Sequence, residues 1–552
     1  PQSSPSLSPL HHQVVVTATR TPKALKDAPV VTRLITANDI KIADATNIQD
    51  LLTEQMPGLE FGYAMNQETS LNMNGFGGNA VLFLVDGERL AGETMDNVDY
   101  SRLNLDNVGR IEIVKGAASA LYGANAVAGV INIISRENSE PWTANVNTRY
   151  NDFNKEWRHG GSFSFNAGKW NSQTSIQRTT SDEVQLTSPF DTESNILHIY
   201  GGEIFNVKER LTYKLSNKVK LIGRGGYFAR ISNRSNYDDH YKDYSAGLKT
   251  VMNLSENDNL EISYGFDQYD KTRFVNNERT HDHDYTNRQN TVRALYSHIF
   301  GKNTLTAGAD FLNDYLTTYQ FANNGSKTQN SYDAFAQFDY NPLQWLNIVA
   351  SLRHDYFSAS SQHATTGRLA LMTKWKGFSI RANYAGGFRA PTLKEMYMNF
   401  DMAGMQMIYG NPDLKPEKSN NFNLALEHTG RVKNAGFFTG QYSLTLMGYY
   451  NKYDKRITTE DYADYTPGTG QPDVASRYCN EDGVEVSGID FSAQYRSDMG
   501  LGVKLDYSYL HVGGRSVDSQ FSQPRPHSAT WRLDYDRQLC SFYRINEVER
   551  LA

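Results

Sequence analysis

The sequence predicts a mainly β fold, a transmembrane antiparallel β-barrel that follows an N-terminal domain of mixed α and β structure. Period-two alternation of apolar and polar residues runs through most of the chain after residue 142. The connections between these strands alternate between short turns and long polar segments, as in outer-membrane barrels. The chain also contains 34 Tyr and 26 Phe, and many strands end in an aromatic residue, as the two interfacial girdles of such a barrel require.

The composition agrees with strands rather than helices as the membrane-spanning elements. The chain has 552 residues and a mean hydropathy of −0.59. Its longest apolar run, residues 80–85, falls far short of the roughly 18 residues that a membrane helix needs. Only alternate residues of a barrel strand face lipid, so low hydropathy is compatible with this fold. The net charge of −6 gives no reason to expect nucleic acid as a partner.

Two cysteines, Cys479 and Cys540, exclude a disulfide-dense scaffold and a cysteine-rich zinc site, and they leave one bridge open. The chain begins at Pro1 without an apolar leader, so we expect a mature form that lacks its signal peptide.

Individual strands show two different faces. In residues 260–266, Leu260, Ile262, Tyr264 and Phe266 alternate with polar or small residues, and residues 305–311, 442–450 and 501–509 repeat the pattern. We count about 18 such strands. Short turns are expected at 169–171, 216–218, 255–259, 301–303, 375–377 and 497–500, and long connections at 181–200, 231–243, 270–289, 318–329, 388–419, 453–484 and 511–525. A β-propeller would instead repeat every ~40 residues.

Three motifs in the first 140 residues resemble a known family. Residues 81–89 read VLFLVDGER, residues 109–116 read GRIEIVKG and residues 117–134 read AASALYGANAVAGVINII. They are similar to the LVDGR, RIEVVRGPASALYG and GGVINIITK patterns in the plug of TonB-dependent receptors. The resemblance covers the whole chain. It implies an outer-membrane protein of a Gram-negative bacterium, with an α+β plug (21–140) in the lumen of a barrel (142–537) of about 22 strands.

Upstream, Val14, Val15, Val16, Thr17 and Ala18 resemble the TonB box of this family. A short β-prone peptide can add as a strand to the edge of a partner's sheet. We therefore expect a flexible leader (1–13), a TonB box region (14–20) and energy coupling through the TonB–ExbB–ExbD complex. The alternative is an ordinary first strand of the plug.

Charged residues of the second motif are candidates for a latch between plug and barrel wall. The family's IRG motif is replaced by residues 72–75, so that Asn74 stands where an arginine often pairs with barrel carboxylates. Arg110, Glu112 and Lys115 remain as candidates. Their alternative role is solvent-facing charge at strand ends.

The sequence contains no GxxxxGK[ST], HExxH or GxSxG element, so we expect no enzyme and an external source of energy. The resemblance implies TonB-dependent import of a scarce chelate. Two alternatives are a passive porin, which would lack plug and TonB box, and a surface protein that binds ligand without transport.

Two further segments bear on the ligand. Residues 387–391 (GFRAP) and 410–414 (GNPDL) resemble the FRAP and NPNL boxes of haem receptors, but the interval between them contains five methionines and no histidine. A thioether can ligate haem iron, and methionines also form adaptable apolar surfaces. We expect haem or a ferric siderophore as ligand, with cobalamin as the alternative. The candidate ligand-binding residues are Tyr63, Met65, Met95, Met402, Met405, Met407 and Tyr409.

Two external loops contain candidate metal ligands. Calcium is a candidate ion for the first loop, with Asp238, Asp239, His240 and Asp243, and an unspecified metal for the second, with His281 and His283. The alternative is a solvated polar loop. No covalent cofactor is expected, and a surface lipoprotein that delivers ligand is a further candidate partner.

The last 15 residues, 538–552, lack alternation and a terminal aromatic residue. We therefore expect an atypical tail. We also expect the barrel to have about four strands fewer than the family's barrel, so that it cannot close in its normal register.

Overall fold

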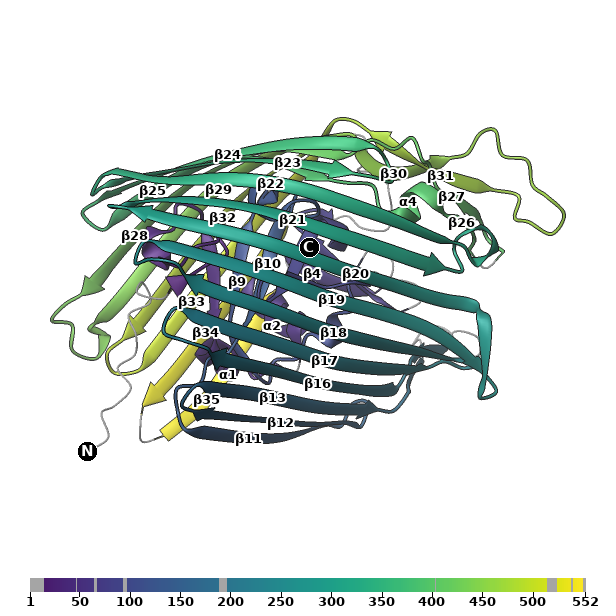
Figure 1. Ribbon diagram of the computed structural model, residues 1–552. Coiled ribbons are helices and arrows are strands. Elements are labelled where there is room, and N and C mark those ends of the chain that lie inside the picture. The colour runs from purple at the N-terminus through teal and green to yellow at the C-terminus, as the bar shows by residue number, and fades with distance from the viewer. Residues whose placement is uncertain are drawn as a thin grey trace.

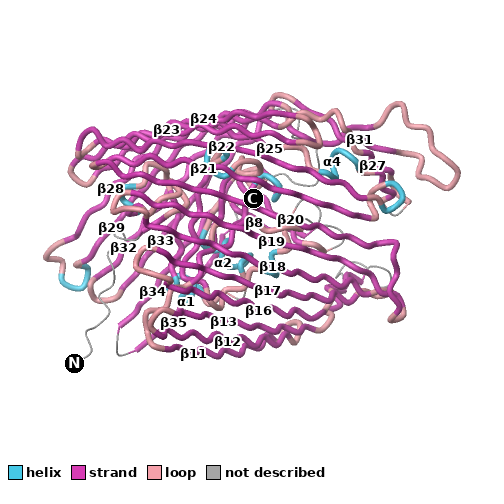
Figure 2. Tube along the Cα trace, viewed as in Figure 1, coloured by secondary structure: helices cyan, strands magenta, loops and turns pink. Residues whose placement is uncertain are grey.

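The computed structural model describes residues 14–45, 47–63, 67–92, 97–187, 196–402, 404–513, 524–537 and 540–549. Long tilted strands form the wall of a barrel, and the N-terminal part of the chain lies inside it (Figure 1). Strands dominate the tube representation, and the few short helices lie within the lumen or in the connections (Figure 2). Within the described ranges, no helix is both long and apolar enough to cross a bilayer.

The wall is one antiparallel sheet of nineteen strands, paired in chain order. The predicted fold class is therefore confirmed, with one strand more than the alternation pattern indicated. The strands are β11 (Trp142–Asn151), β12 (Glu156–Ala167), β13 (Trp170–Ser181), β16 (Gly202–Lys214), β17 (Val219–Asn233), β18 (Asp238–Asn253), β19 (Asp258–Val275), β20 (Glu278–Phe300), β21 (Asn303–Thr318), β22 (Ser326–Leu343), β23 (Leu346–Phe357), β24 (Gln362–Trp375), β25 (Phe378–Arg389), β28 (Glu417–Val432), β29 (Gly440–Asp454), β32 (Val484–Ser497), β33 (Leu501–Gly513), β34 (His527–Arg537) and β35 (Cys540–Glu549).

Three sequence predictions about the wall are wrong. The connection expected at 231–243 is short, since β17 ends at Asn233 and β18 begins at Asp238. The polar residues 270–289 form no long connection, because β19 and β20 continue as a hairpin closed by Asn276 and Asn277 with positive φ angles of 51° and 65°. Asparagine tolerates this left-handed conformation, which matches the twist of a two-residue hairpin turn. The tail is also not irregular, since β35 pairs with β34 from Ala529↔Glu549 to Arg537↔Cys540. Backbone hydrogen bonds alone add β35 to the sheet. Its side chains do not alternate between apolar and polar, so the sequence pattern did not predict this strand.

The long connections carry small sheets of their own. One contains β14 (Val184–Thr187) and β15 (Ile196–Ile199). The other contains β26 (Asn399–Asp401), β27 (Met407–Tyr409), β31 (Ala475–Glu481) and β30 (Arg456–Asp461), and we call it the loop sheet. Cys479 on β31 is a free thiol, and the side chain of Cys540 lies outside the described part.

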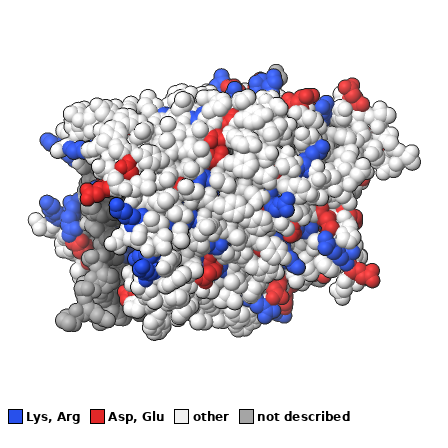
Figure 3. All heavy atoms as spheres, in the orientation of Figure 1, with Lys and Arg blue, Asp and Glu red and all other residues white. Residues whose placement is uncertain are grey.

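Side chains of the wall separate into two environments. On β19, Ile262 and Tyr264 are each 45% exposed on the outer face, whereas Ser263 and Asp267 are buried toward the lumen. The same apolar outer face continues with Leu352 on β23 and Leu424 on β28. Uncharged residues make up most of the outer face seen in Figure 3. A lipid-facing apolar belt around a polar lumen is the arrangement of a membrane barrel.

The plug is built on a five-stranded sheet in the order β3 (Thr32–Thr36), β9 (Val108–Lys115), β10 (Gly129–Ser135), β7 (Val81–Val85) and β8 (Glu88–Arg89). A three-stranded sheet of β4 (Leu59–Tyr63), β5 (Thr69–Met73) and β6 (Phe76–Gly77) lies beside it. The helices are α1 (Ala37–Ala43), α2 (Ile48–Gln55) and α3 (Ser119–Tyr122), with short 3-10 turns at η1 (Leu25–Asp27), η2 (Gly78–Ala80) and η3 (Tyr100–Arg102). Thr36 and Asp39 form a capping box that starts α1.

Two apolar clusters join the plug to the wall. One packs plug residues such as Ile111 and Ile113 against Met447, Tyr449 and other side chains of β28, β29, β32 and β33. The other packs Val130 and its neighbours against residues of β20, β22, β23 and β24. The plug therefore contributes to a core that it shares with the barrel.

The cost of a charge on the outer face should depend on its depth in the membrane. Leu352 lies in the middle of β23 and is 61% exposed, and Trp375 ends β24 at a turn and is 67% exposed. We expect Leu352→Arg to lower the free energy of unfolding by about 2–4 kcal/mol and Trp375→Arg by about 0–1 kcal/mol. Guanidinium unfolding in lipid vesicles measures both, with Leu352→Ala as the control for lost apolar surface. Equal costs at the two positions would contradict a membrane-embedded belt.

Candidate functional site

The predicted TonB box lies inside the molecule. Residues Val14–Val15 form β1, which pairs with β2 (Lys23–Ala24), so that the segment folds back on itself. Val14 is 48% exposed, but Val15, Thr17 and Ala18 are buried. The predicted flexible leader, residues 1–13, lies outside the described residues.

One carboxylate of the plug accepts most of the donors of this segment. Glu112 Oε2 accepts hydrogen bonds from the backbone N–H of Val16 (2.9 Å) and Thr17 (2.7 Å) and from Thr17 Oγ1 (2.6 Å). Tyr122 Oη donates to the carbonyl of Thr17 (3.0 Å). Glu112 is fully buried on β9, and burial raises the pKa of Tyr122 to about 12. Hydrogen bonds to an ionised acceptor are stronger than neutral ones, so Glu112 anchors the segment.

Wall side chains contact the same segment from the opposite side. Gln337 donates to the carbonyl of Thr19 (2.8 Å) and Arg368 to that of Ala18 (3.4 Å). The Arg20 guanidinium lies over the Tyr122 ring (4.6 Å) and 3.8 Å from Asp310 of β21. Burial, and then the nearby Arg293, lowers the pKa of Arg20 to about 10, so Arg20 remains charged at neutral pH. The segment thus touches both plug and wall.

The three predicted latch residues occupy two different places. Lys115 Nζ spans from the plug to Asp490 of β32 (2.7 Å). Arg110 Nε instead pairs with Glu112 on its own strand (2.7 Å), and Glu112 faces the N-terminal segment. The sequence did not show that Lys115 faces the wall and Glu112 the N-terminal segment. Alternation along β9 separates the two faces of the strand but does not identify the element that packs against each face.

Many other ion pairs between plug and wall were not foreseen in the sequence. They include Arg33–Asp506 (2.5 Å), Lys23–Asp339 (2.7 Å), Arg102–Asp243 (2.7 Å) and Asp39–Arg532 (3.0 Å). Asn74, which replaces the family's arginine, is buried with a φ of 52° and donates its N–H to the Gly58 carbonyl (2.9 Å). The attachment of the plug is therefore spread over its surface.

The FRAP-like and NPNL-like boxes build a support for the loop sheet. Arg389 is 1% exposed and pairs with Glu417 on β28 (2.8 Å) and with Glu395 on α4, Leu393–Tyr397 (2.8 Å). Asn411 accepts a hydrogen bond from Arg477 of β31 (3.3 Å) and donates to the carbonyl of Tyr478 (3.0 Å). A buried arginine between two carboxylates fixes the ends of three elements, which gives these boxes a structural role.

The methionines between the boxes do not share one face. Met407 is 4% exposed and packs within the loop sheet, whereas Met405 is 51% exposed and Met402 lies between these extremes. Met396 belongs to an apolar cluster of the wall. The expected methionine surface is therefore not assembled, since only Met407 lies on β27 and Met402 and Met405 precede this strand.

Of the other candidate ligand residues, Tyr63 is 79% exposed at the end of β4. Tyr409 packs against Tyr462 and Tyr465 with ring centroids 5.6 and 5.9 Å apart. Met65 and Met95 lie outside the described residues.

The candidate metal ligands do not converge. Asp239 pairs with Lys271 (3.0 Å) and Arg273 (2.9 Å), and Asp243 pairs with Arg102. His240 lies next to Asp239 on β18 and so points to the other side of the sheet. His281 pairs with Asp284 (2.9 Å) and His283 with Asp282 (3.0 Å). Within the described residues, no three His, Cys, Asp or Glu groups form a metal-binding cluster, and a calcium site in these loops stays a prediction.

Basic and tyrosine side chains meet instead at the loop-side ends of β17–β19. Arg230 lies over the Tyr241 ring (3.9 Å), Arg273 over Tyr237 (3.8 Å) and Arg234 over Tyr200 (4.5 Å). We call these six residues the basic–aromatic cluster. The plug reaches it through Glu68, which pairs with Arg230 (3.1 Å). Cross-strand register creates these pairs, so the sequence alone could not show them.

Removing the Glu112 carboxylate should release the N-terminal segment. We expect Glu112→Ala to speed thiol labelling of a Val16→Cys probe about tenfold or more, since hydrogen bonds to a charged acceptor contribute about 1.5–3 kcal/mol. Labelling of the purified receptor by a maleimide measures the release. Glu140→Ala, which removes an exposed plug carboxylate, is the matched control, and equal rates in both variants would exclude Glu112 as the anchor.

Comparisons with known proteins agree with this architecture. A family model described as "TonB dependent receptor-like, beta-barrel" matches residues 193–546, and one described as "TonB-dependent Receptor Plug Domain" matches residues 24–130. The chain is 25% identical to the vitamin B12 transporter BtuB of Photobacterium profundum over 95% of this chain and 82% of that protein. It is 24% identical to the iron-regulated outer membrane virulence protein of Vibrio cholerae over 91% of this chain and 78% of that protein.

Solved structures show the same fold. The siderophore receptor PirA from Acinetobacter baumannii has a TM-score of 0.75 at 17% identity and covers 94% of this chain and 85% of its own. The haemophore receptor HasR of Serratia marcescens, in complex with its haemophore HasA and haem, has a TM-score of 0.75 at 12% identity, with coverages of 92% and 89%. With a plug inside a wall of antiparallel strands, and with family models that match both parts, the chain belongs to the TonB-dependent receptors.

Proposed function

We propose that this protein is an outer-membrane importer that takes up a scarce metal chelate, with energy supplied by a TonB–ExbB–ExbD complex acting on residues 14–18. The observation that carries this proposal is the placement of that segment. It is bonded to Glu112 of the plug and touches the wall through Gln337 and Arg368. A force that withdraws it acts directly on the contacts between plug and wall.

The coupling follows from the strand geometry. Val14 and Val15 already pair as a short strand with β2, and such a peptide can exchange this partner for the edge of another protein's sheet. Glu112 lies on β9, the strand next to β10 in the plug sheet. Displacement of the segment therefore removes the donors to Oε2 of a buried plug carboxylate and leaves only Arg110 as partner of Oε1, which is costly unless the plug rearranges.

Iron as haem or as a ferric siderophore is the ligand that we favour. The basic–aromatic cluster contains Arg230, Arg234 and Arg273 on tyrosine faces, a lining suited to an anionic and aromatic chelate. A siderophore receptor and a haemophore receptor are among the similar structures. Cobalamin is the second candidate, because the vitamin B12 transporter matches over 95% of this chain. A surface lipoprotein that delivers the ligand remains a candidate partner.

Deletion of residues 14–18 separates import from binding. We expect uptake of the ligand to vanish while binding at the cell surface persists, because the deleted residues are far from the loops that meet the ligand. Uptake by cells that express either form is measured with radiolabelled ligand. A deletion of equal length in the leader, residues 3–7, is the control. Continued uptake without residues 14–18 would point to a passive pore, and binding without uptake in the intact protein to a surface receptor.

A ligand panel tests the chemical class. Haemin, ferric enterobactin and cyanocobalamin are titrated against the full-length receptor, and we expect saturable binding of one of the two iron chelates. Tyr63→Ala should weaken that binding by roughly tenfold, since loss of a stacked aromatic side chain costs about 1–3 kcal/mol. Phe153→Ala, which removes another aromatic residue that is 63% exposed, is the control. Tight binding of cyanocobalamin alone would establish the second candidate.

A further inference from the structure

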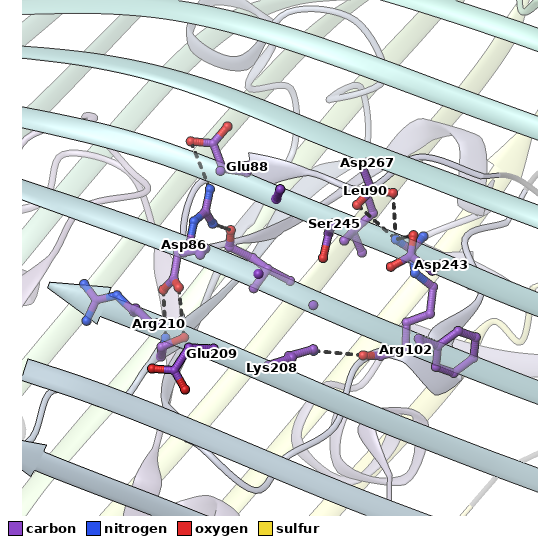
Figure 4. Close-up of a pocket in the computed structure, with 18 of the residues that line it drawn as sticks. Asp86, Glu88, Leu90, Arg102, Lys208, Glu209, Arg210, Asp243, Ser245 and Asp267 are labelled. Atoms are coloured by element: carbon purple, nitrogen blue, oxygen red, sulfur yellow. Dashed lines mark hydrogen bonds and ion pairs between the residues drawn. The ribbon is translucent and has the colours of Figure 1, made fainter.

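A cavity of about 140 Å³ separates the plug from one side of the wall. Plug residues from Val85 to Leu90 line one side, and inward-facing residues of β13 and β16–β20 line the other. Figure 4 shows this space between Glu88 and Asp86 of the plug and Lys208 and Ser245 of the wall. We call it the seam.

Small residues face the seam from the wall. Ser175 on β13, Ser245 and Gly247 on β18 and Gly265 on β19 line it. A side chain at Gly265 would come no closer than 3.5 Å to any neighbour, which is Glu88 Oε2. The wall therefore leaves free space at this place, although larger inward residues stand elsewhere on the same strands.

Some polar atoms in the seam accept no hydrogen bond from the described residues. Gln173 is 2% exposed and Asn206 is 1% exposed, and Oε1 of the former and Oδ1 of the latter are buried without a donor in that part of the chain. Glu88 Oε1 also accepts no hydrogen bond there, but it lies 3.4 Å from the Arg224 guanidinium of the wall. Buried polar atoms of this kind usually have partners. The plug and the wall thus leave part of the hydrogen-bonding capacity of the seam unused.

The rest of the plug surface is attached in a different way. Among the described residues, the two apolar clusters that join plug and wall take their wall members from β20, β22–β24, β28, β29, β32 and β33, and none from β13 or β16–β19. Separation of an apolar interface exposes apolar surface to water, whereas polar side chains such as Lys208 and Asp243 line the seam. On the side of β13 and β16–β19, polar and ionic contacts rather than an apolar cluster therefore attach the described plug residues to the wall.

Ion pairs close both ends of the seam. At the loop side, Arg102 is 3% exposed and pairs with Asp243 (2.7 Å) and Asp267 (2.8 Å), while its carbonyl accepts from Asn206 and Lys208. At the turn side, Arg210 lies 3.8 Å from Glu137, whose side chain is 79% exposed. The seam thus runs from the buried ion pairs of Arg102, at the loop side, to the exposed Glu137 at the turn side.

We infer that the imported ligand passes between the plug and strands β13 and β16–β19, along the seam, and that Arg102 closes its upper end until the plug rearranges. This inference rests on the proposed function, because it assigns a route to the transport proposed above. Arg102 acts as a positioning residue. It lies in the plug, and its two carboxylate partners lie in the wall, so these ion pairs hold the plug against the wall.

A bulky side chain in the seam should block transport without affecting capture. We expect Ser245→Leu to reduce energised uptake about tenfold, because the larger side chain would fill part of the seam and obstruct the ligand, while cell-surface binding stays unchanged. The probe is whichever of haemin, ferric enterobactin and cyanocobalamin the intact receptor imports. Ala246→Leu places the same side chain on the outer face of the same strand and should import normally. Uptake by Ser245→Leu at the rate of the intact protein would overturn the inference.

A second measurement does not require that the protein folds with a leucine at position 245. In a Cys479→Ser, Cys540→Ser background, Ser245→Cys reports on the seam, and Met447→Cys, buried in an apolar cluster on the other side, reports on the packed interface. During energised uptake we expect faster labelling by a small charged thiol reagent at Ser245→Cys only. Faster labelling at Met447→Cys alone, or at neither position while uptake proceeds, would overturn the route. If the intact protein imports none of the three ligands, the proposed function fails instead.

Discussion

In lipid, every backbone N–H and C=O needs a partner within the protein, and the rest of the structure depends on this constraint. Nineteen strands pair in chain order, so that each strand from β12 to β34 has a neighbour on both sides, whereas the described residues show no pairing between β11 and β35. The same pleat gives each strand one apolar and one polar face, as Ile262 and Ser263 illustrate. A wide lumen lined with polar groups is the consequence, and a separately folded plug fills it.

The polar lumen determines how the plug is attached. Pairs such as Lys115–Asp490 and Arg33–Asp506 connect it to the wall, together with two apolar clusters on one side of the lumen. Breaking one partner of a buried pair is costly, so such contacts suit a switch better than a permanent joint. The N-terminal segment enters this network through Glu112, and among the described residues neither apolar cluster joins the plug to the wall on the side of the seam.

Residue patterns predicted much of the fold because their causes are local. Alternation in residues 260–266 reflects the two environments of one strand, and the plug motifs are long enough to identify the family. The pattern was misleading where a cause is not local. The polar hairpin at residues 270–289 and strand β35 are defined by backbone pairing with neighbouring strands, which side-chain polarity does not report.

The sequence by itself determined the class of fold and the division into plug and barrel, since strand periodicity and contiguous motifs carry these properties. Only the tertiary structure decided which charges meet. It placed Glu112 against Thr17 rather than the wall, Asp239 between Lys271 and Arg273 rather than on a metal, and Arg389 between two glutamates. Each contact joins residues from different strands or from plug and wall, and their proximity arises only when the sheet curves around the plug.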